Sequence, residues 1–290
     1  MVQVRDRARD TLSDERQFGS AALRLLYGTR WGGPLRALAI RPLVSELAAL
    51  THRGRRSARD IAPFCADYGV AVADFVRPPG GWASFADFFV RDWADGARPL
   101  PDDPDALLSP ADAKLLVVPL GADTGLVVKG VAYRVEGLLG DAALAARFAG
   151  GWAFVLRLTV DDAHRYVHAA SGTCRGHRRL GGVLHTVGPR AGRRPVLVQN
   201  RREYAVVDTD RFGALVQAEI GAILVGRIRN SACGGGVRRG SEKGRFELGG
   251  STVVLLCEPG RVIPDPDLVA WSARGVETRV RAREPIGRAP

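Results

Sequence analysis

Apolar and polar residues follow different patterns in the two parts of this chain, and the pattern changes near residue 100. From Phe18 to Leu50, apolar side chains recur at mixed spacings of three and four, which is typical of amphipathic helices. Gly32-Gly33-Pro34 predicts a break between two such helices. Arginines interrupt this stretch at positions 24, 30, 36 and 41. We therefore expect residues 1–100 to be a helical and irregular N-terminal region.

From about residue 105 onward, short apolar runs alternate with Gly, Pro, Asp and Asn, which is the pattern of strands separated by turns. The runs are Leu115–Leu120, Gly125–Val128, Trp152–Val160, Gly182–Val187, Tyr204–Val207, Ala214–Val225 and Thr252–Cys257. Only Leu138–Phe148 suggests a helix here, and strands and helices do not alternate regularly. The pattern predicts an α+β protein whose residues 101–290 form a mainly antiparallel β core.

The composition fits a folded protein with an affinity for anions. The chain has 290 residues, 46% of them hydrophobic, and a formal net charge of +11 that comes almost entirely from arginine. Such a charge favours nucleic acid or an anionic lipid surface. The low aromatic content of 7% and the lack of a nucleic-acid-binding motif disfavour nucleic acid. The basic helices of residues 18–60 either lie on an anionic bilayer or pack on their own domain.

Membrane-spanning, secretory, disulfide-rich and metal-binding classes are not indicated. No run of 18 apolar residues occurs, and the N-terminus lacks the apolar core of a signal peptide. Cys65, Cys174, Cys233 and Cys257 are scattered without a CxxC pair, so we expect reduced cysteines and a cytosolic setting. His164 and His168 have the spacing of a metal pair, but no third ligand is evident, and we expect no metal.

The sequence Gly249-Gly250-Ser251-Thr252 stands directly before the apolar run that ends at Cys257. By itself this tetrapeptide is a common turn. A serine that follows two glycines at the start of a strand also has the pattern of a self-cleavage site, because glycine does not resist a strained peptide geometry. Backbone cleavage before Ser251 converts that serine into a pyruvoyl group, which supplies a ketone that no ordinary side chain provides.

Several segments, taken in order, resemble the phosphatidylserine decarboxylase family, especially its shorter bacterial branch. The resemblance covers about residues 20 to 287. Two departures stand out: Ala113 replaces a usual glycine, and Ala163 replaces a usual tyrosine. The matching segments are Phe85–Arg91, Gly96–Pro99, Ser109–Lys114, Leu158–Tyr166, Leu184–Val187, Asn200–Tyr204, Glu219–Gly226 and Gly240–Thr252.

The resemblance implies a self-processing lyase that makes phosphatidylethanolamine from phosphatidylserine. Asp112, His164 or His168, and Ser251 are then the relay that cleaves the chain between Gly250 and Ser251, because an imidazole must take the serine proton and a carboxylate orients the imidazole. The products are fragments 1–250 and 251–290, the second carrying the pyruvoyl group. That ketone condenses with the substrate amine and withdraws electrons as CO₂ leaves, and a histidine reprotonates the carbanion.

The histidine strand departs from the family pattern. The family commonly has a second histidine three residues after the first, but Val167 occupies that place and His168 follows it. A shift of one residue turns a strand side chain to the other face. Either a bulge redirects His168, or His164 does the work of both histidines and His168 is a surface residue.

The remaining expectations concern the substrate and its surroundings. Arg238, Arg239 and Lys243 lie on a glycine-rich basic segment that either holds the lipid phosphate or is a solvated loop. The expected location is peripheral, on the cytoplasmic face of the cell membrane, and the two fragments or a homodimer are the expected protein partners. Two alternatives stay open: another amino-acid substrate on this scaffold, or a serine hydrolase that uses Asp112, His164 and Ser251.

Overall fold

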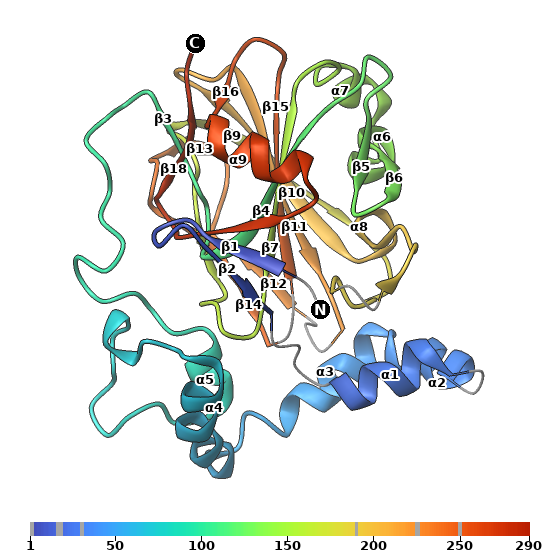
Figure 1. The fold of residues 1–290 in the computed structure, drawn as a ribbon, viewed down its shortest axis with the longest axis vertical. Coiled ribbons are helices and arrows are strands. Elements are labelled where there is room, and N and C mark those ends of the chain that lie inside the picture. Colours follow the sequence, from blue (N-terminus) through green and yellow to red (C-terminus); the bar gives the residue numbers. More distant parts are fainter. Residues whose placement is uncertain (1–2, 16–19, 30–31, 189–190, 224–226, 249–250) are drawn as a thin grey trace.

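The computed structural model describes residues 3–15, 20–29, 32–188, 191–223, 227–248 and 251–290. Figure 1 shows a body of strands with helices against its faces, and a group of N-terminal helices below it. The α+β class with a mainly antiparallel core is confirmed. Gly250, half of the predicted cleavage site, lies outside the described residues.

The main sheet has ten strands in the order β13-β9-β10-β11-β15-β7-β4-β17-β1-β2. Between described residues its pairs are antiparallel except β1 with β17, which are parallel. The strands are β1 (Gln3–Asp6), β2 (Thr11–Asp14), β4 (Ala113–Pro119), β7 (Trp152–Leu158), β9 (Gly172–Leu180), β10 (Arg202–Thr209), β11 (Ala214–Gly221), β13 (Gly235–Val237), β15 (Ser251–Cys257) and β17 (Glu277–Val280).

The central strands of the main sheet are buried on both faces, because side chains alternate along a strand and both sets are mainly apolar there. On β15, Val253 and Leu255 belong to one hydrophobic cluster, whereas Val254 and Leu256 belong to the other. Helices cover both faces: α9 (Pro266–Ala273) lies on the first, and α6 (Val135–Leu139), α7 (Ala142–Ala146) and α8 (Val196–Gln199) lie on the second.

Three smaller sheets complete the body. The first, in the order β12-β14-β8, packs on the same face as Val253, because Ile228, Phe246 and Tyr166 belong to that cluster. Its strands are β8 (Arg165–Val167), β12 (Arg227–Asn230) and β14 (Glu242–Glu247). The other two sheets comprise β3 (Ala106–Leu108), β16 (Ile263–Pro264) and β18 (Pro285–Arg288), and the hairpin of β5 (Gly125–Val128) and β6 (Val131–Arg134).

The N-terminal region was expected to be helical and irregular, but it also contributes two strands. These strands, β1 and β2, join the edge of the main sheet. The helices α1 (Ser20–Gly28), α2 (Gly32–Ala39) and α3 (Pro42–Leu50) form an arm below the body (Figure 1). Further elements follow as η1 (Arg55–Asp60), α4 (Ile61–Tyr68), η2 (Val72–Asp74) and α5 (Phe85–Phe89). Gly32 and Pro34 start α2, since proline is tolerated in a first helical turn, and Pro42 starts a third helix that the pattern did not predict.

Two further elements differ from their prediction. The helix expected over Leu138–Phe148 is two short helices, because Gly140 adopts a left-handed backbone that ends α6 and Asp141 caps α7. The run Gly182–Val187 is no strand and makes one isolated bridge at Val183. No described helix is long and apolar enough to cross a membrane.

Candidate active site

Ser251 begins β15 in the middle of the main sheet, opposite Leu158 of β7 and Gly221 of β11. Its side chain shares a face with Val253 and therefore points between the main sheet and the sheet β12-β14-β8. Ser251 is 0% exposed, and within the described part of the chain its Oγ has no hydrogen-bond partner. A buried hydroxyl without a partner is destabilising, so its persistence here suggests a use in chemistry.

His164 lies beside the chain that leads to Ser251. The amide of Phe246 donates to the carbonyl of His164 at 2.8 Å. The His164 ring packs against the Phe89 ring at a centroid distance of 3.8 Å and an interplanar angle of 31°, and Leu248 packs in the same cluster as Phe89. The imidazole is therefore fixed in position, next to the segment that ends at the serine.

The hydrogen bond of His164 fixes which ring nitrogen accepts a proton. Nδ1 lies 3.1 Å from the carbonyl oxygen of Asp162, so Nδ1 carries the hydrogen and donates it. Nε2 is buried and has no partner among the described residues. Burial first, and then the charge of Arg91, lowers the pKa of His164 to about 3. At neutral pH the ring is uncharged, with its free lone pair on Nε2, which is the form of a general base.

His168 lies beyond the other end of β8 and faces a different group of residues. Its backbone amide donates to the carbonyl of Ser241 at 2.9 Å, and its Nδ1 is buried without a partner in the described structure. Burial, followed by the charges of Lys243 and His177, lowers the pKa of His168 to about 4. The surface position considered from the sequence is therefore wrong, since His168 is buried.

The bulge that the sequence analysis considered lies on the partner strand. Glu242 pairs with Val167 and Gly244 pairs with Tyr166, which leaves Lys243 as the extra residue of β14. Lys243 is 1% exposed and its Nζ lies 2.7 Å from a carboxylate oxygen of Glu219, which is 0% exposed. Glu219 stands opposite Val253, on the face of the sheet that carries Ser251. The irregular strand thus places an ion pair beside the serine.

This ion pair was not predicted. Asn230 extends it, because its amide nitrogen donates to Glu219 at 3.3 Å and to Glu203 at 3.1 Å. Burial raises the pKa of Glu219 despite the nearby charge of Lys243. The available sequence signal was a single carboxylate inside the apolar run Ala214–Val225, because an acidic residue in a buried strand needs a partner.

Asp112 is held by other partners than the predicted histidine. Arg98 donates to both of its carboxylate oxygens, at 2.8 and 2.9 Å, and Trp93 Nε1 and the amide of Ala282 also donate to it. Burial alone raises the pKa of Asp112, but the hydrogen bonds and charge of Arg98 outweigh it, so the pKa lies below its usual value. No hydrogen bond between described residues joins Asp112 to His164 or His168, and its relay role stays a prediction.

The three cations predicted at the phosphate do not form one cluster. Lys243 is buried against Glu219, and the guanidinium of Arg239 donates to the backbone carbonyls of Asp103 and Pro101 at 2.6 and 2.7 Å. Arg238 is exposed. Phosphate binding by these residues stays a prediction, and Arg238 is the one whose side chain is open to solvent.

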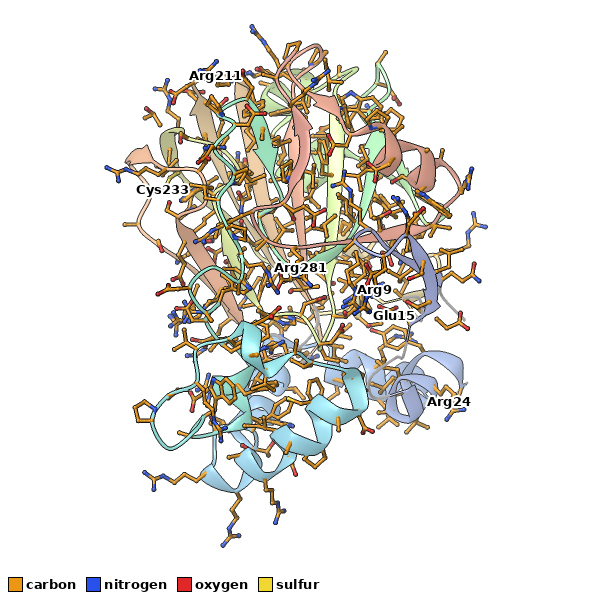
Figure 2. The ribbon with its side chains drawn as sticks, turned by 60° about the vertical axis from the view of Figure 1, so that its left-hand side comes forward. Arg9, Glu15, Arg24, Arg211, Cys233 and Arg281 are labelled. Carbon is orange, nitrogen blue, oxygen red and sulfur yellow. A yellow bond between two sulfur atoms is a disulfide. The ribbon has the colours of Figure 1, made fainter. Side chains whose placement is uncertain are left out.

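The expectation of reduced cysteines is wrong for one pair, because Cys174 and Cys233 form a disulfide with a Cα–Cα distance of 5.5 Å. The strand β13 places Gly235 opposite Cys174, which brings Cys233 to the edge of the sheet (Figure 2). Spacing along the chain could not indicate this pair, since the two cysteines are 59 residues apart. A ring nitrogen of His177 lies within 4.8 Å of both sulfurs.

The chain is similar to known proteins over most of its length. Residues 85–288 match the family model described as phosphatidylserine decarboxylase. The chain is 36% identical over 275 residues to phosphatidylserine decarboxylase proenzyme 2 of Clostridium acetobutylicum, covering 94% of each chain. It is 36% identical over 282 residues to phosphatidylserine decarboxylase proenzyme of Chlamydia trachomatis, covering 96% of this chain and 94% of that protein. The chain therefore belongs to the phosphatidylserine decarboxylase family and is a decarboxylase.

Proposed function

We propose that this chain cleaves itself between Gly250 and Ser251 and then decarboxylates phosphatidylserine to phosphatidylethanolamine with a pyruvoyl group made from Ser251. The observation that carries the proposal is the fully buried Oγ of Ser251, which has no partner among the described residues. A neutral imidazole with a free Nε2 lies beside the same segment, on His164. These two groups are what proton removal from a serine requires.

Self-cleavage proceeds through an ester. Ser251 Oγ gives its proton to the base and bonds to the carbonyl carbon of Gly250, while the peptide C–N bond breaks and the Ser251 nitrogen gains a proton. Loss of the Cα proton then expels the Gly250 carboxylate from Cβ and leaves dehydroalanine. Addition of water and release of ammonia convert the dehydroalanine into the pyruvoyl group at the start of fragment 251–290.

The residues around Ser251 fit such a group. A pyruvoyl group at the start of β15 would supply a carbonyl able to bind the substrate amine and to draw electrons from the bond to its carboxylate. Lys243 is paired with Glu219 and so does not compete for that carbonyl as a free amine. His164 Nε2 accepts the Ser251 proton before cleavage, and it returns a proton to the substrate carbon after CO₂ leaves. His168 is the second group able to move a proton.

The substrate is taken from an anionic membrane surface through the helical arm, at the cytoplasmic face of the membrane. Six leucines of α1–α3 are about half exposed or more, with Leu43 the most exposed at 68%. They are Leu25, Leu35, Leu38, Leu43, Leu47 and Leu50. Arg24 projects from α1 into solvent (Figure 2). Exposed leucines next to arginines suit the boundary between lipid headgroups and acyl chains.

Denaturing mass spectrometry of the intact protein tests the proposal. We expect two masses, those of 1–250 and of a pyruvoyl-bearing 251–290, and release of CO₂ from phosphatidylserine. Ser251→Ala should give one full-length mass and no CO₂, whereas the control Ser241→Ala, whose exposed hydroxyl bonds to the Arg238 carbonyl, should be cleaved normally. Cleavage of Ser251→Ala would refute the mechanism. A full-length wild-type chain that is acylated at Ser251 would identify a serine hydrolase instead.

A further inference from the structure

The loop of residues 184–186 connects the helical arm to the sheet that carries Ser251. Three hydrogen bonds join described residues of the arm to residues 184–186. The amide of Leu184 donates to the carbonyl of Ile40 at 2.8 Å. The amide of Thr186 donates to the phenolic oxygen of Tyr27 at 3.1 Å. These bonds link the position of the arm to the body of the protein.

Tyr27 of α1 makes its second bond to His185, with 3.2 Å between the phenolic oxygen and Nδ1. Thr186 donates to the same oxygen, which leaves the phenolic hydrogen able to donate to Nδ1 of His185. Burial first, and then the charges of Arg194 and Arg36, lowers the pKa of His185, which favours the neutral ring that can accept this hydrogen. The guanidinium groups of Arg36 and Arg194 lie 5.5 and 5.3 Å from the Tyr27 ring centre and help to hold it.

Hydrogen bonds through Asn200 join the backbone of His185 to β11, the strand that pairs with the start of β15. Asn200, fully buried, accepts from the His185 amide at 2.9 Å, and its own amide nitrogen donates to the His185 carbonyl at 2.8 Å. The same nitrogen donates to the carbonyl of Gly221 at 2.7 Å. Gly221 is the residue that stands opposite Ser251 in the pairing of β11 and β15. A continuous chain of hydrogen bonds thus runs from Tyr27 through His185 and Asn200 to the serine's neighbour.

We propose that Tyr27 and His185 are positioning residues that couple the seating of the arm on a lipid surface to the placement of the Ser251 strand. The inference rests on the proposed function. In water no orientation of the arm removes the exposed leucines from solvent, so none is favoured by the hydrophobic effect. A bilayer that buries these leucines favours one orientation of α1–α3. Fixing α1 holds Tyr27, and with it His185 and Asn200, in the arrangement that aligns Gly221 with Ser251.

The test compares Tyr27→Phe with the wild type on two forms of the substrate, a short-chain phosphatidylserine below its critical micelle concentration and phosphatidylserine in phosphatidylglycerol vesicles. The phenylalanine keeps the ring between the arginines and removes only the oxygen. We expect the wild-type kcat to rise on vesicles about fivefold or more, as is typical of coupling between sites. Tyr27→Phe should mature, co-sediment with vesicles and turn over the monomeric substrate like the wild type, but gain less than about twofold on vesicles.

Two control variants distinguish loss of coupling from loss of membrane binding and from a general effect of removing a buried hydroxyl. Tyr204→Phe removes a hydroxyl from the opposite face of the sheet and should keep the full vesicle stimulation. Leu43→Asn should weaken vesicle binding and reduce stimulation along with it. Full stimulation of Tyr27→Phe, an equal loss on both substrates, loss of its vesicle binding, or an unstimulated wild type would each overturn the coupling. Absence of CO₂ release from either substrate by the wild type would instead overturn the proposed function, and the coupling with it.

Discussion

The substitution Asp112→Asn tests how Asp112 supports maturation. Asp112 can act by anchoring neighbouring segments or by a direct relay to histidine. The carboxylate accepts two hydrogen bonds from Arg98, one from Trp93 and one from the amide of Ala282. In Asp112→Asn the buried guanidinium of Arg98 loses its main counter-charge. The new side-chain amide nitrogen also faces groups that are themselves hydrogen-bond donors. We expect the fold to be weakened and self-cleavage to slow.

The magnitude follows from the partners that remain. Removing one member of a buried ion pair typically costs about 3–5 kcal/mol. Arg98 keeps a bond of 3.0 Å to Asp74, whose side chain is 30% exposed, so the loss should be near the lower end, about 3 kcal/mol. Because a domain of this kind is stable by about 5–15 kcal/mol, the variant should still fold. Urea unfolding in a Ser251→Ala background, where the chain should stay in one piece, measures this difference.

Arg98→Met is the matched variant, since it breaks the same pair and leaves the Asp112 carboxylate in place. If Asp112 acts by anchoring residues 98 and 282 to the start of β4, both variants should lose similar stability and both should form fragments more slowly, as followed by denaturing electrophoresis. Normal maturation of Arg98→Met beside a block in Asp112→Asn would refute the anchoring argument and support a direct relay to histidine. Unchanged stability in both variants would refute the estimate from the ion pair.

The other predictions concern the histidines and the arm. His164→Ala should abolish fragment formation and CO₂ release while His168→Ala keeps a measurable fraction of both, and the reverse order would contradict our ranking. Both folded-state pKa values, about 3 for His164 and about 4 for His168, lie below the unfolded value of about 6.5, so the unfolded chain binds more protons as the pH falls. Stability of the uncleaved chain should therefore fall progressively from about pH 6.5 toward pH 4, and an equal urea midpoint at pH 7.5 and pH 5 would count against buried neutral rings. Leu43→Asn with Leu47→Asn should weaken vesicle co-sedimentation at least about tenfold, because each buried leucine contributes roughly 1.5–3 kcal/mol, and unchanged sedimentation would exclude this face.

The sequence by itself determined the local features of this protein. Alternation and run length predicted β4, β5, β7 and β15 close to their observed bounds, because the side chains that these strands bury are apolar and show in the sequence itself. The run predicted over Ala214–Val225 begins where β11 begins, but β11 ends at Gly221. The glycines before Ser251 and the segments around His164 indicated the family and the candidate chemistry. The polar strand β9 was missed, because arginines occupy an exposed strand near the sheet edge and hide its period.

Only the tertiary structure decided which distant groups meet. A bulge in β14 turns Lys243 inward, where it pairs with Glu219. Packing brings Arg98 against Asp112, and strand pairing brings Cys174 and Cys233 together. These outcomes depend on register and on the approach of segments far apart in the chain. Side-chain period is a property of neighbouring residues, whereas the partner of a buried charge or thiol is fixed by whichever strand or loop the whole fold brings against it.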